Sequence, residues 1–429
     1  MFAVTTERSA ARPGSMASIG RIAQAEWLRT VLSPLRVGSF RLYVCANFFQ
    51  LVSSWSQRFA LLWIVWESSH SMGMLSFVPI GEMAPTIWLG YIAGIVADKT
   101  NRFHIVIGVQ RCLAVVAFLL STVAASAMGP TPAIILWCLN GTLIAFLTPA
   151  AFSLTPMMVG RELLPKAIAI NSVSYSIAVF IAPVSVYILI EAIGPWIIFL
   201  LNGIVLLIYT AVISKISQNF QSAVGVKRGS VGGQRRAWSP QVTAPIVGTL
   251  ASLAIVCMLF RPIGELLPGI VASLHGKADL ALIATLTSAF TFGGLFSSLI
   301  LLGWISPSNA SRINGPAALG LSVSAIAMIW TESNAILTLI MFAFGLTLAM
   351  NATLALVLVQ LEADEQSRGK LVSIYFYVYS GGTALGSVLY GIGEAFPRSI
   401  IVFASIVFTV FSACRFVGER RRKLWGNRL

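Results

Sequence analysis

Five ionisable side chains stand inside long apolar stretches of the sequence: Arg58, Glu82, Arg111, Arg261 and Glu265. A lone charge at the centre of a bilayer costs about 2.5–3.5 kcal/mol, so residues of this kind are functional-site hypotheses by default. A buried carboxylate can take up and release a proton, and a buried guanidinium can hold an anionic group. These residues therefore predict a polar site inside an otherwise apolar protein.

Arg261 and Glu265 are four residues apart, which places them on one face of a helix. Pro262 and Pro268 interrupt the hydrogen-bond ladder of that helix, and broken helices with charged groups near mid-depth are where transporters bind cargo. Glu82 lies about ten residues into its apolar stretch and suits a proton carrier. The alternatives are a structural ion pair for Arg261 and Glu265, and a carboxylate held permanently by an arginine or hydroxyl for Glu82.

Arg58 follows Trp55, Ser56 and Gln57, a set of polar groups beside a tryptophan that fits a binding wall. Arg58 has a second interpretation, as the partner of an acidic residue in the other half of the protein. For Arg111 we expect packing or a side chain that snorkels to the membrane surface.

Asn140 and Asn351 fall at matched positions in the two halves of the chain. An unpaired amide in hydrocarbon costs several kcal/mol, so each amide needs a partner. Hydrogen bonds between helices supply one explanation, and contact with cargo supplies the other. Several aromatic residues offer stacking surfaces to an aromatic or amphipathic cargo, although most such residues simply pack; they are Trp63, Tyr175, Tyr375, Tyr377 and Tyr379.

The elements that position these residues are membrane-spanning helices. The 429 residues are 57% hydrophobic and 10% charged, with a mean hydropathy of +0.85, outside the range of soluble domains. Apolar stretches recur at about the 20 residues needed to cross a bilayer. We predict twelve spans, at about 43–66, 73–97, 104–128, 132–157, 167–191, 196–214, 243–273, 279–303, 313–331, 335–359, 371–394 and 399–417.

The charge distribution indicates the topology. A net charge of +14 in a soluble protein suggests nucleic acid. Here most of the lysines and arginines fall at the two termini and in alternate loops, with Lys277 and Arg398 in the opposite loops. This bias predicts that both termini are cytoplasmic and that the chain binds no nucleic acid.

The spans divide the chain into two similar lobes. We predict a cytoplasmic N-terminal segment (1–41), an N-terminal six-helix lobe (42–214), a cytoplasmic linker (215–241), a C-terminal six-helix lobe (242–417) and a basic cytoplasmic tail (418–429). RELLPKAIAINS (161–172) and DEQSRGKLVSIY (364–375) follow the fourth and tenth spans, offset by about 200 residues. Parallel repeats of this kind characterise two-lobed transporters.

The join between the second and third spans carries Gly94, Asp98, Lys99 and Arg102. The charges must lie at the membrane surface, and Thr100 or Asn101 can cap the next helix. A solvated loop held in the cytosol by positive charge is one interpretation. The pattern also resembles the loop signature of the major facilitator superfamily, whose members have twelve helices. In that family the loop is part of a latch that holds one of two alternating states.

Three stretches narrow the resemblance: 39–71, 161–172 and 367–376 are similar to the branch that contains the enterobactin exporter, macrolide efflux pumps and related drug or siderophore exporters. Two positions depart from that branch. Ser53-Ser54 stands where many members carry Gly-Asp, so no proton carrier is placed there. Ala182-Pro183 stands where antiporters carry Gly-Pro, which keeps the helix break and loses the glycine.

We therefore expect an all-α inner-membrane transporter with two six-helix lobes. The resemblance implies that it exports a siderophore or amphipathic drug by proton antiport, as a monomer. The alternatives are a proton-coupled importer of an iron chelate or other small solute, and a membrane scaffold without transport. The sequence lacks HExxH, GxSxG and Walker A patterns, so we predict no enzyme, no cofactor and no metal site.

Overall fold

The structure is a computed structural model of the chain. It describes residues 32–126, 128–160, 162–223, 243–276, 278–304, 310–362 and 368–426. Residues 1–31 and most of the predicted linker lie outside these ranges, as do Arg161 and 364–367 from the two repeated stretches. Every regular element in the described residues is a helix or helical turn, which confirms the predicted fold class.

The first lobe begins with a 3-10 turn at Ser33–Arg36. Local capping marks some of its helix starts: the Ser71 side chain accepts from the backbone N–H of Met74, and Asn101 accepts from Phe103. The helices are α2 (Gly38–Ser69), α3 (Met72–Lys99), α4 (Arg102–Ala125), α5 (Pro130–Phe152) with the short α6 (Leu154–Met158), α7 (Leu164–Ala192) and α8 (Trp196–Ala223).

The second lobe starts with a broken helix, as Pro262 and Pro268 predict. It consists of α9 (Ala244–Ile255), a π-turn at Val256–Phe260, α10 (Arg261–Glu265) and α11 (Leu267–His275). The unbroken helices that follow are α12 (Leu280–Trp304), α13 (Ala310–Trp330), α14 (Asn334–Glu362), α15 (Arg368–Ile392) and α16 (Pro397–Gly426).

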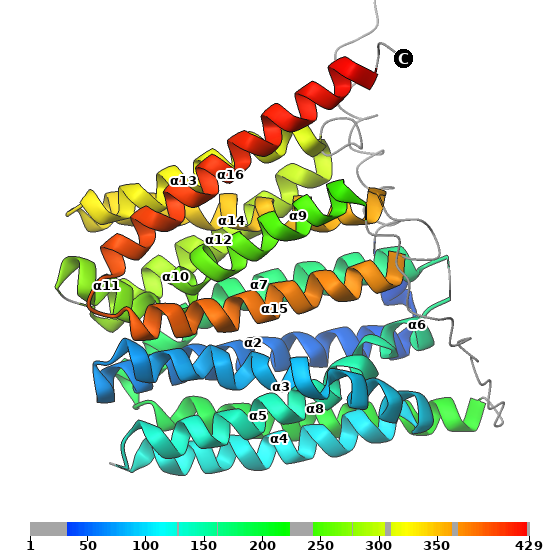
Figure 1. Cartoon of the computed structure of the whole chain (residues 1–429). Helices are drawn as coiled ribbons and strands as arrows, with labels where there is room; N and C mark the ends of the chain where they lie inside the picture. Colours follow the sequence, from blue (N-terminus) through cyan, green and yellow to red (C-terminus); the bar gives the residue numbers. More distant parts are fainter. Residues whose placement is uncertain are drawn as a thin grey trace, which may run out of the picture.

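The long helices run side by side and alternate in direction (Figure 1). With α5 and α6 taken as one crossing, and α9 to α11 as another, the chain crosses twelve times and its first and last described residues lie at the same end of the bundle. We call this end the terminal face and the other end the opposite face. α8 and α16 extend past the predicted span ends at 214 and 417, since a helix continues into polar sequence once it leaves hydrocarbon.

Within the described residues, nine helical stretches are long and apolar enough to cross a membrane. α2, α3 and α15 lie in the middle of the bundle (Figure 1). They carry buried polar side chains such as Gln57, Ser76 and Thr383. These polar side chains therefore lie where other helices shield them from lipid.

The two lobes repeat the same helix contacts. α3 packs on α5 in the first lobe, and α12 packs on α14 in the second. Glycines permit both contacts: a Cβ on Gly141 would lie 2.1 Å from the Gly81 carbonyl oxygen, and one on Gly345 would lie 1.9 Å from that of Phe290. The matched close approaches support the internal repeat that the sequence predicts.

Gly90/Gly94 and Gly382/Gly386 are GxxxG spacings, which predict close helix packing at surfaces that slide. For Gly382 and Gly386 the sliding role is wrong. Both glycines pack inside the second lobe, where a Cβ on Gly386 would lie 2.0 Å from the Met258 carbonyl oxygen. Gly90 does face the other lobe, with the Tyr377 hydroxyl 3.8 Å from its Cβ position, whereas Gly94 faces open space.

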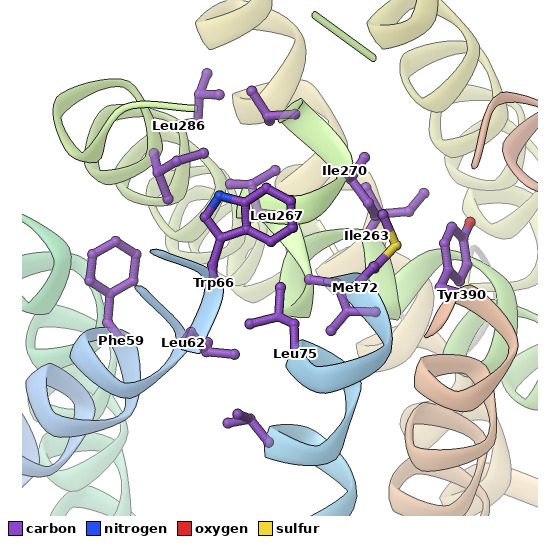
Figure 2. Close-up of a cluster of buried hydrophobic side chains, with 14 of the residues drawn as sticks. Phe59, Leu62, Trp66, Met72, Leu75, Ile263, Leu267, Ile270, Leu286 and Tyr390 are labelled. Carbon is purple, nitrogen blue, oxygen red and sulfur yellow. The ribbon is translucent and has the colours of Figure 1, made fainter. Parts of the chain in front are cut away.

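Buried apolar residues show where the lobes touch. Near the opposite face, one continuous core takes side chains from both lobes, including Trp66 and Met72 from the first and Ile263 and Leu267 from the second (Figure 2). Near the terminal face, each core cluster belongs to a single lobe: one surrounds Phe40 in the first, and another surrounds Leu301 in the second. The lobes are therefore packed together at the opposite face and separate in their cores at the terminal face.

Candidate functional site

Four charged side chains meet where the two lobes join. Arg58 of α2 donates from Nε to Glu82 Oε2 of α3 at 2.7 Å, and from Nη2 to Glu265 Oε2 of α10. Arg261 of α10 forms an ion pair with Glu265, with 3.2 Å between Nη2 and Oε1. Arg58 is thus bonded to a carboxylate of its own lobe and to a carboxylate of the other lobe. We call these residues the central cluster.

The central cluster lies deep within the protein. The Arg58 and Glu265 side chains are 11% and 10% exposed, whereas those of Glu82 and Arg261 are 23% and 22% exposed. Removing charges from water is costly, and pairing two arginines with two glutamates offsets the cost and leaves no net charge. Removing one partner of such a pair leaves an uncompensated buried charge, which typically costs about 3–5 kcal/mol.

The break in the seventh crossing positions Arg261 and Glu265. The π-turn ends at Phe260, and α10 starts directly at Arg261 with Pro262 in its first turn, where proline needs no N–H partner. α10 then ends at Glu265, with Leu266 outside helical geometry. Irregular turns of this type are tolerated at membrane depth where they line a polar site.

Aromatic rings flank the central cluster on the side toward the terminal face. The Arg261 guanidinium lies 4.3 Å from the Tyr379 ring centroid, and that of Arg58 lies 5.4 Å from the Trp55 ring. Tyr175 meets Trp55 edge-on at 5.7 Å and is 46% exposed. Tyr175 also lies near Tyr379 and Arg261. These rings from α2, α7 and α15 form a wall that contains both charge and aromatic surface.

Two predicted stacking residues do not belong to this wall. Trp63 is buried in the apolar core near the opposite face. Tyr375 is buried in the second lobe, and its hydroxyl donates to the Ala352 carbonyl at 3.1 Å. Periodicity could not separate these rings from Tyr175 and Tyr379, because all of the helices concerned are apolar around most of their circumference.

Gln57, which the sequence places in the binding wall, is buried inside its own lobe. The side chain is 3% exposed, and its Oε1 accepts from Asn202 Nδ2 of α8 at 2.6 Å. Successive helix residues differ in direction by about 100°. Because Arg58 faces the other lobe, its neighbour Gln57 turns into its own lobe.

Asn351 and Asn140 are both buried. Asn351 Nδ2 donates to the Ala317 carbonyl of α13 at 3.0 Å and to the Thr347 carbonyl at 2.8 Å. For Asn351 this is the helix-to-helix bonding that the sequence offered as the alternative to cargo contact. Arg111 lies exposed on α4, away from the central cluster, in keeping with the snorkelling interpretation.

The predicted gating residues fall at the turn between α3 and α4. Lys99 ends α3, Arg102 begins α4, and Asn101 caps α4. Gly94 has no other atom within 4 Å of its Cβ position. Asp98 lies in α3, and its side chain is outside the part of the chain that the structure describes. The open surroundings of Gly94 match the separation of the two lobe cores near the terminal face.

The chain was compared with known families and structures. A family model described as "transmembrane secretion effector" matches residues 29–413, which span both lobes. The chain belongs to the transmembrane secretion effector family, within the major facilitator superfamily. No curated protein matches this family member.

Several transporters of known structure share the fold of this chain. A bacterial homologue of the human lysosomal transporter Spinster, described as inward-facing and occupied, has a TM-score of 0.67 at 14% identity, covering 90% of this chain and 97% of that one. A bacterial homologue of the iron transporter ferroportin, described as inward-facing, gives 0.65 at 16%, covering 88% and 99%. A peptide transporter in complex with sulfate gives 0.66 at 13%, covering 89% and 94%. The protein is a multi-pass membrane transporter of the major facilitator type.

Proposed function

We propose that this transporter exports an amphipathic small molecule, a drug or a siderophore, in exchange for protons. The observation that carries the proposal is the position of Arg58, which bonds Glu82 in one lobe and Glu265 in the other. An interaction that crosses the lobe boundary forms only when the lobes are together at that depth. Any ligand that breaks it favours the alternative arrangement of the lobes.

Protons and cargo compete for the central cluster in this scheme. A proton on Glu82 or Glu265 removes the negative charge that holds Arg58. Cargo entering from the terminal face meets the Tyr175 and Tyr379 rings and competes with Arg58 or Arg261 for a partner. Either ligand weakens the bonds that Arg58 makes between the lobes. With neither ligand bound, these bonds hold the lobes together. If the lobes change arrangement only with cargo or with protons bound, cargo moves in one direction and protons return in the other. This is antiport.

Export follows from orientation. We propose that the terminal face is cytoplasmic in the inner membrane, because Lys99, Arg102, Lys166 and Lys215 lie near it and basic residues favour the cytoplasm. A site that is entered from this face takes its cargo from the cell. The secretion effector family description supports the same direction. A single chain forms both lobes of the site, so we propose a functional monomer.

Inside-out membrane vesicles give a direct test. Acidifying the vesicle lumen should drive uptake of fluorescent amphipathic dyes or an iron-free catecholate chelator, and nigericin should abolish it. Glu82→Gln and Glu265→Gln should weaken the dependence on the pH gradient, whereas Glu191→Gln, at the exposed end of α7, should not. Unchanged pH dependence in both cluster variants would place proton coupling elsewhere.

The same assay separates the competing functions. Loss of preloaded chelate from acidic vesicles, without uptake, would indicate an importer. No gradient-dependent flux with any probe, from protein that inserts normally, would favour a membrane scaffold. Lower accumulation of the probe in expressing cells, reversed by a protonophore, is the result expected of the exporter.

A further inference from the structure

The start of α3 and the end of α15 meet across the lobe boundary at the opposite face. The backbone N–H of Gly73 belongs to the first turn of α3, where N–H groups have no partner within the helix. Glu394, in the turn after α15, accepts from Gly73 N at 3.0 Å and from the Ser71 hydroxyl at 3.2 Å. A carboxylate of the second lobe therefore satisfies the helix start of the first.

Glycine at position 391 permits the close approach of the two helices. A Cβ on Gly391 would lie 2.6 Å from Ser76 Oγ and 3.3 Å from the Cα of Gly73. Ser76 Oγ has no freedom to withdraw without losing its 2.7 Å bond to the Gly73 carbonyl. Any larger residue at 391 would push α15 away from α3.

The surrounding residues are buried and anchored. Met72 and Leu75 of α3 lie in the shared apolar core with Ile263 and Tyr390 (Figure 2). The Tyr390 hydroxyl donates to the Leu259 carbonyl at 2.8 Å, which ties the end of α15 to the broken helix of its own lobe. Movement of α15 at this point is thus movement of the second lobe.

We propose that Ser71, Gly73, Gly391 and Glu394 form a clasp that holds the opposite face closed and must open once in each transport cycle. The proposal rests on the alternating-access function proposed above. Gly73 lies nine residues before Glu82, about 13 Å along the helix at 1.5 Å per residue. The clasp therefore does not touch the central cluster, and its members are positioning residues.

The expected effect of Glu394 is modest because its side chain is exposed. A carboxylate at an exposed helix start shifts an equilibrium about two- to fivefold. This shift favours the closed form because the contact exists only when α3 and α15 are together.

Distance measurements between spin labels test the clasp. Labels at Met128→Cys and Ser333→Cys, both exposed at the opposite face in different lobes, are placed in a chain whose five native cysteines are alanine. Glu394→Ala should raise the population with a long distance about two- to fivefold. Glu332→Ala, an exposed glutamate on the same face and in the same lobe, is the matched control and should leave it unchanged.

A second variant acts through shape instead of charge. Gly391→Ala should shift the label distances further toward separation than Glu394→Ala, while Gly108→Ala, which adds a Cβ in open space on α4, should not. Unaltered distances in both clasp variants, with normal thermal unfolding, would overturn the clasp. Because these distances are measured without cargo or a pH gradient, a failure of proton exchange would leave the result intact.

Discussion

The shape of the Arg58 side chain allows it to bond two carboxylates at once. Guanidinium presents N–H groups in a planar fork, so one arginine can bond a carboxylate on α3 and another on α10. Its Nε faces Glu82 and its Nη2 faces Glu265. The residue therefore joins three helices from two lobes with one charge.

We expect that lysine at position 58 does not support transport as arginine does. An ammonium is a point charge on a flexible stem and does not reproduce the planar fork. Arg58→Lys should reduce vesicle uptake at least tenfold, about 1.4 kcal/mol in the rate-limiting step, with normal insertion. Arg111→Lys, on the exposed side of α4, is the control. Equal uptake in the two variants would contradict the bridging role.

Gln57→Ala should affect stability and leave transport parameters unchanged. It removes the acceptor of the buried Asn202 amide, which typically costs about 1–3 kcal/mol. We expect a lower thermal unfolding temperature in detergent and an unchanged KM. A raised KM with normal stability would return Gln57 to the binding wall.

The sequence was sufficient to select the residues of the central cluster, since a charge in an apolar stretch is visible without a structure. The sequence also offered an ion pair between Arg261 and Glu265 and an acidic partner for Arg58 in the other half, but it did not identify that partner. Arg58 and Glu265 are separated by 207 positions, and only the packing of two lobes brings them together. The clasp was missed for a related reason: Gly73, Gly391 and Glu394 lie at span ends, where glycine and glutamate are ordinary.

At the scale of helices, paired glycines fix how closely α3 approaches α5 and how closely α12 approaches α14. The spans and the broken seventh crossing could be predicted from apolar length and proline positions. The face that each helix presents could not, because a helix that is apolar all round has no hydrophobic side to align. This is why Gly382 and Gly386 were assigned to the wrong contact.

Gly141→Val should prevent correct packing of the first lobe. Its Cβ would lie 2.1 Å from a backbone oxygen of α3, which cannot move without displacing the helix. We expect little folded protein on size-exclusion chromatography. Gly108→Val, which adds a side chain in open space, should elute normally. Normal elution of both would contradict the packing assignment.

Asp98→Asn tests the latch implied by the turn between α3 and α4. The substitution removes the charge while keeping the shape of the side chain. Turnover in vesicles should fall while membrane insertion and dye binding persist. Turnover of Asp98→Asn at the wild-type rate would show that Asp98 does not act in the latch.

At the scale of the whole molecule, a shared core at the opposite face and separate cores at the terminal face define one of two arrangements of the lobes. The other must separate residues that are now in contact, such as Ser76 and Gly391. Because Ser76 and Gly391 are in contact only in this arrangement, a covalent bond between them would stop the transport cycle. A Cβ on Gly391 would lie 3.0 Å from Ser76 Cβ. A disulfide needs about 3.5–4.5 Å between the two Cβ atoms, so a slight separation of α15 from α3 would bring two cysteines to bonding distance.

Ser76→Cys with Gly391→Cys should therefore lock the opposite face. In the background without native cysteines, oxidation should abolish vesicle uptake and dithiothreitol should restore it. Each single variant should be insensitive to oxidant. Continued uptake by fully oxidised protein would show that the two helices do not separate during transport.

The two arginines and two glutamates of the central cluster have a consequence for energetics. Moving one elementary charge through the membrane potential is worth about 2.3 kcal/mol per 100 mV, but the four side chains sum to zero. The side chains of the central cluster should then add no net charge to the loaded carrier when it changes state. Only the bound cargo and protons would then carry charge across the membrane. The current per cycle would therefore report the net charge that they carry.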